Sequence, residues 1–322
     1  MLTIQPIQEI KKGAIIEFLS KYSTHLYSRA LVFRSFQTNS LLADLLYDYE
    51  KGGSVFIVSD QSEIEAIIAF RNRDWDTEYF GYKSASLDHL YVRGGERVKG
   101  VIKILSNNLD KWLEKNDIRL ISTKVFPQKE TIELLKEKNF NFLLEEYVLT
   151  KTLPDQTIPL IKDDKIRSYR EKDRQSIIDI IKSVKWQERF HKDEHFSKEK
   201  ADGMYLLWFT NSLGKNNVHI TVLESEDHKA VGFTIWSLEK VFFGKEEILL
   251  ANQELVAVHP EMQGQGWGAR LYMGTLMDIQ EAGAHIVKTT ISAENIPAIK
   301  NHKKLKFEFD YKIAVYHKFC NL

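Results

Sequence analysis

Apolar and polar residues alternate along several short stretches in the second half of the chain, as in residues 217–224, NVHITVLE. A period of two is typical of a β-strand with one buried face. Apolar residues that recur every three or four positions, such as Leu271, Leu276 and Ile279, instead predict a helix. In order, this half predicts strands over 217–224, 230–238 and 248–258, a helix over 269–283, a strand over 284–291, a helix over 295–305 and a strand over 307–318.

The first half of the chain predicts the same order of elements. These are strands over 54–59, 64–70 and 87–92, a helix over 101–116, a strand over 119–125, a helix over 129–138 and a strand over 140–150. The offset that aligns Val92 with Val258 also places Gly100 on Gly266. Phe140 pairs with Phe307 at an offset one residue larger. The near-constant offset and the matching loop lengths favour an internal duplication over two unrelated α/β stretches.

The duplication predicts a mixed α/β protein of two tandem domains, over residues 1–152 and 165–322. The join falls in residues 153–164, LPDQTIPLIKDD, which hold two of the six prolines and an acidic pair. Such composition is typical of a linker between domains.

Composition narrows the possible partners. The 45 basic and 45 acidic residues give a formal net charge of zero, which disfavours a general binder of nucleic acid. The single cysteine, Cys320, cannot build a disulfide framework or a structural zinc site, and we expect no metal. The chain has no apolar run of membrane-spanning length and no secretion signal at its start. We therefore expect a cytoplasmic protein without a membrane partner.

The stretch 258–268, VHPEMQGQGWG, follows a predicted strand and opens a predicted helix. Gly264, Gly266 and Gly268 allow the backbone to turn tightly and a ligand to approach it closely. Backbone N–H groups and the helix dipole make such a turn an anion site, best suited to a pyrophosphate. The Lys-Ser/Thr pair of a P-loop is missing, which disfavours a nucleoside triphosphatase.

The segment from Gln263 to Gly268 resembles the Gln/Arg-x-x-Gly-x-Gly/Ala signature of the GNAT family of N-acetyltransferases. Asn295 and Ala298, followed by Phe307, resemble the family's second hallmark before the last strand. The likeness covers about residues 166–319 and is weighed against an unrelated glycine-rich turn in a Rossmann-like protein. It implies two tandem GNAT-like acyl-CoA N-acyltransferase domains, with acetyl-CoA as the acyl donor.

The resemblance also implies which residues hold acetyl-CoA. The pyrophosphate would rest on the amides of the glycine loop, and the pantetheine arm would pair with the splayed edge of the preceding strand. The implied residues are Leu255, Val256, Val258, Gln263, Gly264, Gln265, Gly266, Trp267, Gly268, Ala269, Asn295 and Ala298.

The first copy departs from the glycine pattern. At the matching positions, residues 97–102 read RVKGVI, so that β-branched residues replace two of the three glycines. We expect the first copy to keep the fold without a working cofactor site, to pair with the second copy and to help wall the acceptor pocket. Binding of cofactor by both copies is the alternative.

Amine acetylation needs a base for the amine and an acid for the thiolate. Glu254 lies on the strand before the loop, where burial would suit it to be the base; a solvent-facing carboxylate is the alternative. In many members of the family that this sequence resembles, a tyrosine seven residues after the residue that corresponds to Asn295 acts as the general acid. His302 stands there, on a basic helix face that we expect to be exposed, and an imidazolium can also protonate a thiolate. Tyr316 and Tyr272 are the fallback donors.

The region before the second copy's first strand is the expected acceptor side. Arg189, His191 and Trp208 suit a sugar-phosphate acceptor, although the helical spacing of Trp208 favours packing in the core. Together with residues 75–81, WDTEYFG, the Arg-Phe-His segment resembles the dTDP-fucosamine acetyltransferase group. This implies an amine on a nucleotide-linked sugar, with another small amine or a peptide N-terminus as competing acceptors.

Two further functions stay open. One is a sensor or scaffold that binds acetyl-CoA without turnover, which the missing tyrosine favours and Glu254 opposes. The other is transfer of a longer acyl group, or of an aminoacyl group from tRNA, which the zero net charge disfavours. The expected partner is a small-molecule amine, and a homodimer is left open.

Overall fold

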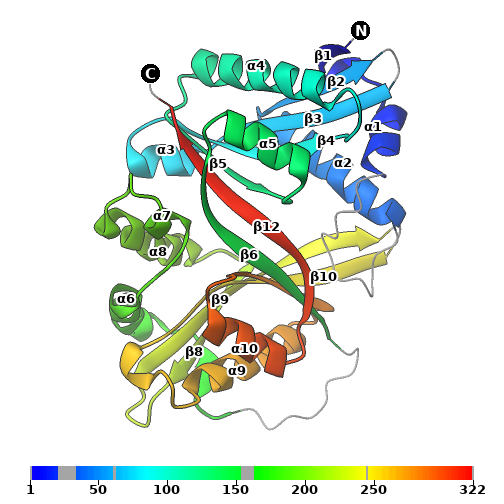
Figure 1. Ribbon diagram of the computed structural model, residues 1–322. Helices are drawn as coiled ribbons and strands as arrows, with labels where there is room; N and C mark the ends of the chain where they lie inside the picture. The colour runs from blue at the N-terminus through cyan, green and yellow to red at the C-terminus, as the bar shows by residue number, and fades with distance from the viewer. Residues whose placement is uncertain (1, 21–33, 61–62, 154–162, 244–245, 321–322) are drawn as a thin grey trace. The chain divides into compact units, whose positions relative to one another are not determined.

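A computed structural model describes residues 2–20, 34–60, 63–153, 163–243 and 246–320 (Figure 1). Contacts divide them into two compact units. Unit 1 holds the described residues up to 145 together with 312–320, and unit 2 holds those from 146 to 311. Both units are mixed α/β structures, as the sequence predicts.

Unit 1 is a mixed sheet with strand order β1-β2-β3-β4-β5-β12. Its elements are β1 (Leu2–Pro6), η1 (Ile7–Glu9), α1 (Lys12–Leu19), α2 (Arg34–Glu50), β2 (Ser54–Asp60), β3 (Glu63–Asn72), α3 (Asp74–Phe80), β4 (Ser84–Val92), α4 (Val98–Asn116), β5 (Leu120–Val125), α5 (Lys129–Glu137) and most of β12 (Glu308–Phe319).

Helices cover both faces of the unit 1 sheet. In β2, Val55 and Ile57 pack with the apolar residues of α1 and α2. The alternate residues Phe56 and Val58 pack with those of α4 and α5. Because successive side chains of a strand point to opposite faces, one short sequence supplies two cores.

Unit 2 has the strand order β6-β11-β10-β9-β8-β7. Its elements are most of β6 (Asn141–Thr152), β7 (Ile166–Ser168), η2 (Glu171–Asp173), α6 (Arg174–Ser183), α7 (Arg189–Lys192), α8 (Lys198–Ser212), β8 (Val218–Glu224), β9 (Ala230–Phe243), β10 (Glu246–Val258), η3 (Pro260–Met262), α9 (Trp267–Glu281), β11 (Ile286–Ser292) and α10 (Ile296–Lys304).

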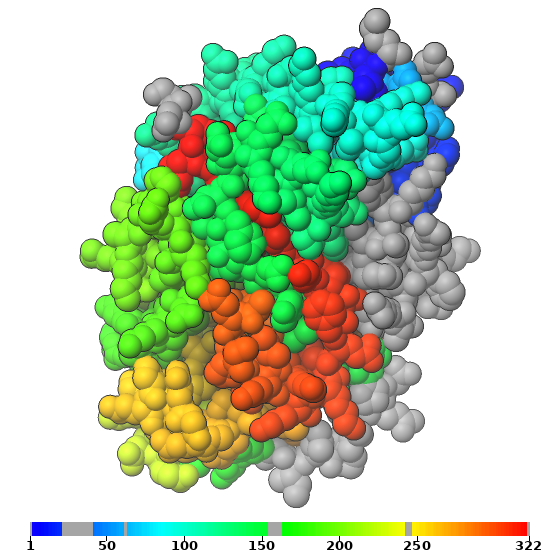
Figure 2. All heavy atoms as spheres, in the orientation of Figure 1, coloured from blue at the N-terminus to red at the C-terminus, as the bar shows by residue number. Residues whose placement is uncertain are grey.

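The unit 2 sheet is also covered on both faces. Leu255 and Ala257 of β10 pack with the apolar residues of α6 and α8. Ala251 and Val258, on the same strand, pack with those of α9. In Figure 2, the orange atoms of α9 and α10 form the surface on one face of this unit.

The predicted duplication is visible in the strand registers. In unit 1, β4 pairs in parallel with β5 as far as Leu87 and Thr123. In unit 2, β10 pairs in parallel with β11 as far as Gln253 and Thr289. The same offset carries Leu87 onto Gln253 and Thr123 onto Thr289, and it is the offset that aligns the two halves of the sequence.

The last strand of each half joins the sheet of the other half. In unit 1, β12 pairs with β5, and Tyr316 lies opposite Thr123. In unit 2, β6 pairs with β11, and Leu149 lies opposite Thr289. The expected domains, 1–152 and 165–322, follow the order of the sequence, whereas the compact units exchange these strands. Of the expected join, residues 154–162 lie outside the described residues.

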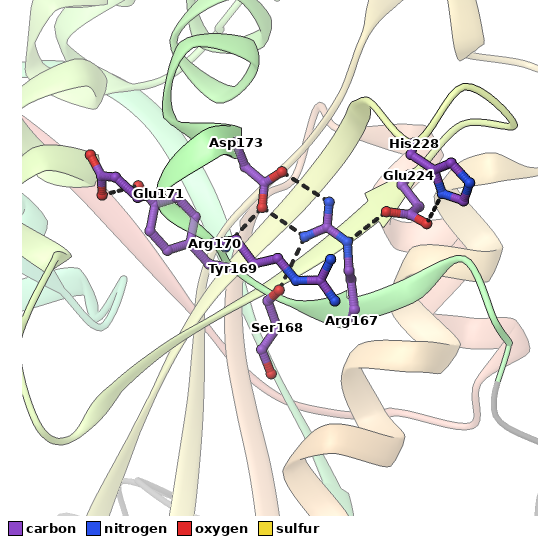
Figure 3. A network of polar contacts seen from close by, with 8 residues as sticks. All are labelled: Arg167, Ser168, Tyr169, Arg170, Glu171, Asp173, Glu224 and His228. Carbon is purple, nitrogen blue, oxygen red and sulfur yellow. Dashed lines mark hydrogen bonds and ion pairs between the residues drawn. The ribbon is translucent and has the colours of Figure 1, made fainter.

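An ion-pair network ties the edge strand β7 into unit 2 (Figure 3). The Arg167 guanidinium donates to both carboxylate oxygens of Asp173 at 2.7 and 2.9 Å. Its Nε lies 2.6 Å from Glu224 on β8, which also contacts His228 at 2.8 Å. Hydrogen bonds from His228 and Arg167 lower the pKa of the Glu224 carboxyl to about 2. The network therefore joins β7, η2 and β8.

Candidate active site

Strands β10 and β11 separate halfway along their length. Their parallel pairing stops at Gln253 and Thr289, although β10 continues to Val258 and β11 to Ser292. The Thr289 hydroxyl donates to the Gln253 carbonyl at 3.1 Å, where the strands part. Beyond this point β10 pairs only with β9 in the described part of the chain. Its other edge is open to an extended ligand, which backbone groups would bind as an added strand.

Glu254 occupies a β-bulge at the point of separation. On β9, Trp236 and Ile235 are consecutive, and they lie opposite Gln253 and Leu255 of β10. Glu254 is the extra residue between these two. A bulge bends its strand and redirects a side chain, and bulges are frequent beside active sites.

Two neutral donors hold the half-buried Glu254 carboxylate. The Ser237 hydroxyl on β9 donates to Oε1 at 2.5 Å, and the Trp208 indole N–H on α8 donates to Oε2 at 3.3 Å. The expectation that Trp208 is a core residue is wrong, because its side chain is 37% exposed. The structure thus brings together the predicted base and one predicted acceptor residue. The sequence analysis missed Ser237, because nothing in the pattern of β9 (AVGFTIWSLEKVFF) marks this serine as a partner of Glu254.

The predicted glycine loop follows β10. Gly264 and Gly266 adopt the left-handed conformation, with φ of 78° and 88°, which explains glycine at these positions. Gln263 closes the loop, since its Nε2 donates to the Val258 carbonyl at 3.0 Å. A Cβ atom at Gly264 or Gly266 would meet no other atom within 4 Å, so both positions border open space.

Helix α9 starts at Trp267, directly after Gly266, and no side chain caps its N-terminus. The N–H groups of a first helical turn have no intrahelical acceptor. Together with the helix dipole, they favour an anionic group in front of the helix.

The beginning of α9 is fixed by its neighbours. Arg270 makes a two-pronged ion pair with Asp163, at 2.7 and 2.9 Å, and lies over the Trp267 ring. A Cβ atom on Gly268 would come 3.6 Å from the Asn301 side chain of α10. Unlike Gly264 and Gly266, Gly268 does not have a positive φ.

Asn295, predicted to contact the cofactor, is the N-cap of α10. Its Oδ1 accepts a hydrogen bond from the Ala298 N–H at 3.2 Å. Ala298 is buried. Both residues thus have a structural role in starting this helix, as is common for an N-cap asparagine.

The expectation that His302 lies on an exposed face is wrong, because the side chain is almost fully buried. Its Nδ1 lies 2.8 Å from the Ala298 carbonyl and its Nε2 lies 3.2 Å from the Gln253 side-chain amide. Burial lowers the pKa of His302 and favours the neutral imidazole. In the neutral imidazole, Nδ1–H donates to the Ala298 carbonyl and Nε2 accepts. With the oxygen and nitrogen of the Gln253 amide interchanged, the amide N–H donates to Nε2. Both imidazole nitrogens are engaged within the fold.

The fallback donors are buried as well. Tyr316 belongs to the core of unit 1, where its ring packs edge-on against Phe142, whereas Glu254 and the glycine loop belong to unit 2. Tyr272 of α9 packs edge-on against His302. Burial raises the pKa of both phenols. Each is positioned for packing.

Aromatic rings gather on the expected acceptor side. Tyr205 stacks on Trp186, with centroids 4.2 Å apart, and packs beside Trp208. His191 lies against Tyr205 and pairs with Asp202 at 2.9 Å. On the same side, the Arg189 guanidinium lies over the Phe190 ring, 4.5 Å from its centroid. The predicted residues Arg189, His191 and Trp208 therefore lie on two adjacent helices, α7 and α8.

The corresponding loop in unit 1 is shorter. After Val92, α4 already begins at Val98, whereas α9 begins at Trp267 after Val258. Gly100, matched to Gly266 by offset, therefore lies inside α4, where its Cβ would come 3.1 Å from Leu2. The expectation of equal loop lengths is wrong here. Ile102 is buried in the core of unit 1.

Among the described residues, no group of three or more His, Cys, Asp and Glu side chains is arranged to hold a metal ion. None of the helices described combines the length and the hydropathy of a membrane span.

Comparison with solved structures places the whole chain among tandem GNAT folds. A "Tandem GNAT protein from the clavulanic acid biosynthesis pathway" has a TM-score of 0.56 at 14% identity, covering 100% of this chain and 99% of that one. A GCN5-related N-acetyltransferase from Sphaerobacter thermophilus has a TM-score of 0.60 at 11% identity, covering 99% and 95%. At such identities the likeness shows the fold alone.

The comparison with curated protein sequences found no match. Residues 183–307 match the sequence profile of the acetyltransferase (GNAT) family. The matched segment contains the bulged Glu254, the open edge of β10, the left-handed glycine loop and the start of α9. The match to the GNAT family is thus confined to residues 183–307, while the chain as a whole has a tandem GNAT fold, and the protein is an acyltransferase.

Proposed function

We propose that the protein transfers the acetyl group of acetyl-CoA to a primary amine, and that unit 2 carries the reaction. The observation that supports this most is the sequence of features along β10. A carboxylate at a bulge, an open strand edge and an anion-binding loop follow one another from Glu254 to Gly266. Acetyl-CoA has its parts in the same order: the thioester would lie at the carboxylate, the pantetheine arm along the open edge and the diphosphate at the loop.

Acetyl-CoA, when bound, would supply the reactive thioester. The N–H groups around Gly264, Gly266 and Trp267 would donate to its diphosphate. The backbone groups of β10 from Leu255 to Val258 would pair with its pantetheine arm. Gln263 holds the loop closed through the Val258 carbonyl and so keeps these donors in place.

Glu254 is proposed as the general base, because an amine must lose its proton before it attacks a thioester. The carboxylate is held by two neutral donors and is half-buried, so it keeps lone pairs for a proton. The proposed acceptor side supports this assignment, since Trp208 contacts the same carboxylate and is partly exposed. Attack is direct, because Cys320 is buried in the core of unit 1.

The proposed acceptor is an amino group on a nucleotide-linked sugar. Arg189 would pair with a phosphate, and the partly exposed Trp208 ring offers a face for a sugar. Unit 1 is proposed to lack a cofactor site, because its loop is shorter and Gly100 lies within α4.

A second candidate is a protein that binds acetyl-CoA without turnover. The buried His302, at the position where relatives carry an acidic tyrosine, favours it. Thiol release measured over a panel of amines separates the two functions. Saturable acetyl-CoA binding without thiol release for any amine would support the sensor.

The glycine loop gives the sharpest test of the proposed site. Gly266→Val places a β-branched residue at φ 88°, in the open space before α9. We expect acetyl-CoA affinity to fall about 100-fold or more, since several charge-assisted hydrogen bonds are blocked. Isothermal titration calorimetry measures this loss directly.

Gly214→Val is the matched control, because Gly214 also has a left-handed φ of 77° and open surroundings but lies after α8. It carries the same backbone strain away from the site. Equal acetyl-CoA affinity in Gly266→Val and Gly214→Val would overturn the assignment of the loop.

A further inference from the structure

Both units carry a carboxylate at the same bulge. In unit 1, Phe70 and Ala69 of β3 lie opposite Leu87 and His89 of β4, which leaves Asp88 as the extra residue. Asp88 is related to Glu254 by the same offset that relates the two parallel pairings. The duplication has thus preserved an acidic residue where each central strand leaves its parallel neighbour.

The side chain facing this carboxylate differs between the units. In unit 2, Ser237 of β9 donates a hydrogen bond to Glu254. The residue at the same position of β3 is Arg71, whose Nε lies 2.9 Å from Asp88 Oδ2. Arg73 contacts the other oxygen, Oδ1, at 2.9 Å.

The two arginines belong to a larger charged cluster in unit 1. Arg71 also pairs with Asp48 of α2 at 3.0 Å, and His89 lies 3.4 Å from the same carboxylate. Burial alone would raise the pKa of Asp48, but His89 and the arginines outweigh it and the pKa is lowered. The cluster therefore favours the ionised form of Asp48.

We propose that Ser237 is the positioning residue of the active site, because its neutral hydroxyl aims the Glu254 carboxylate and leaves it able to accept a proton. Arg71 at the matching position binds Asp88 as an ion pair, and together with Arg73 it occupies both carboxylate oxygens. This inference rests on the proposed function of Glu254. It makes one residue of the neighbouring strand decide which of two duplicated carboxylates acts as a base.

The charges around Glu254 support this difference. Within the described residues, its two hydrogen-bond donors, Ser237 and Trp208, are uncharged. Tyr205 packs beside Trp208, which contacts Glu254. The charged groups near Tyr205 are Glu188, Arg189, Glu146 and Asp202. Among them Asp202 pairs with His191 and Lys198. On β9 the nearest acidic residue in sequence, Glu239, is exposed. No ion pair to Glu254 is found in the part of the chain that the structure describes, so a guanidinium at position 237 would add a cation to a carboxylate that has neutral donors.

The first test replaces Ser237, the residue of β9 that contacts Glu254. Ser237→Arg imitates unit 1, Ser237→Ala removes the hydroxyl, and Ser237→Thr retains it. For Ser237→Arg we expect kcat at neutral pH to fall about 100-fold, with the acidic limb of the pH–kcat profile at lower pH. Ser237→Ala should lower kcat about 10-fold at unchanged KM for acetyl-CoA, because only the aim of the base is lost. Ser237→Thr should restore the wild-type profile.

A readout without turnover separates this inference from the proposed function. Side-chain carbonyl NMR follows protonation of Glu254 directly, assigned with Glu254→Gln. The titration midpoint of Glu254 should fall by about 1–3 pH units in Ser237→Arg and stay near wild type in Ser237→Thr. Should Ser237→Arg fail to fold, Arg71→Ser with Arg73→Ser tests the same rule in unit 1, where the midpoint of Asp88 should rise.

The outcomes are distinct. Unchanged midpoints in both sets of variants would overturn the role of position 237, even for an active enzyme. A shifted midpoint in a protein that releases no thiol with any amine would instead support the role of Ser237 and contradict the proposed acetyl transfer.

Discussion

At the scale of single residues, environment decides what each polar side chain does. Glu254 and His302 were both proton-transfer candidates, yet the structure gives them different surroundings. Glu254 is half-buried at a bulge with an open strand edge beside it, whereas both nitrogens of His302 are engaged inside the fold. The carboxylate therefore remains the candidate for proton transfer, and His302 is a packing residue of α10.

Glu254→Gln tests the base directly. Glutamine keeps the size of the side chain. Its amide oxygen can accept from the Trp208 indole N–H, and its amide N–H can donate to the Ser237 hydroxyl oxygen, so the fold should be preserved. We expect turnover at neutral pH to drop about 100-fold or more, with the acidic limb of the pH profile lost. Steady-state kinetics between pH 5 and pH 9 measures both effects.

Glu239→Gln is the control for this variant, because Glu239 lies on β9 and is exposed. It should behave as wild type. A Glu254→Gln enzyme with the wild-type pH profile would remove Glu254 from the mechanism.

At the scale of elements, short strands depend on charged contacts. Strand β7 has only three residues, Ile166–Ser168, and lies at the edge of the unit 2 sheet. Arg167 joins it to η2 and β8 through Asp173 and Glu224. Because these side chains are largely buried, the loss of one partner leaves an uncompensated charge.

Arg167→Gln should lower the free energy of unfolding by about 3–5 kcal/mol near pH 7. The pKa of Glu224 is lowered to about 2, so the unfolded chain binds more protons below pH 4.5. The stabilisation is therefore fully present above pH 4.5 and is lost as the pH falls towards 2. In the variant, stability should depend less on pH within this window, as measured by urea unfolding.

Arg174→Gln is the matched control, since Arg174 makes an exposed ion pair with Glu171. It should change stability by less than about 1 kcal/mol. Similar losses for the two variants, or an unchanged pH dependence in Arg167→Gln, would contradict the role given to the network.

At the scale of the whole molecule, the exchange of β6 and β12 links the two halves of the sequence. Each unit takes its last sheet strand from the other half. Tyr316 and Leu149 occupy equivalent positions, since they lie opposite Thr123 and Thr289. A change at the C-terminal end of the chain should therefore be felt in the N-terminal unit.

Tyr316→Ala should cost about 3 kcal/mol and speed amide hydrogen exchange in β5, because the cavity opens in the core of unit 1. Leu149→Ala should cost a similar amount and act on β11 instead. Hydrogen exchange followed by mass spectrometry resolves the two strands. Faster exchange in β11 for Tyr316→Ala would contradict the strand exchange.

Much of the fold was predictable because its signals are local. The alternation along 217–224 and the helical spacing around Leu271 predicted β8 and α9. The near-constant offset between the two halves predicted the repeated registers. Gly264 and Gly266 predicted the turn before α9, because a left-handed backbone favours glycine.

Tertiary structure decided what local patterns leave open. Alternation identifies a strand but not its neighbour, so the exchange of β6 and β12 was not predictable from the sequence. The basic residues around His302 predicted exposure, yet the packing of α10 buries its side chain. Only the register of β9 against β10 places Ser237 on Glu254, and only that of β3 against β4 places Arg71 on Asp88. Such contacts join residues far apart in the chain, and folding in three dimensions fixes them.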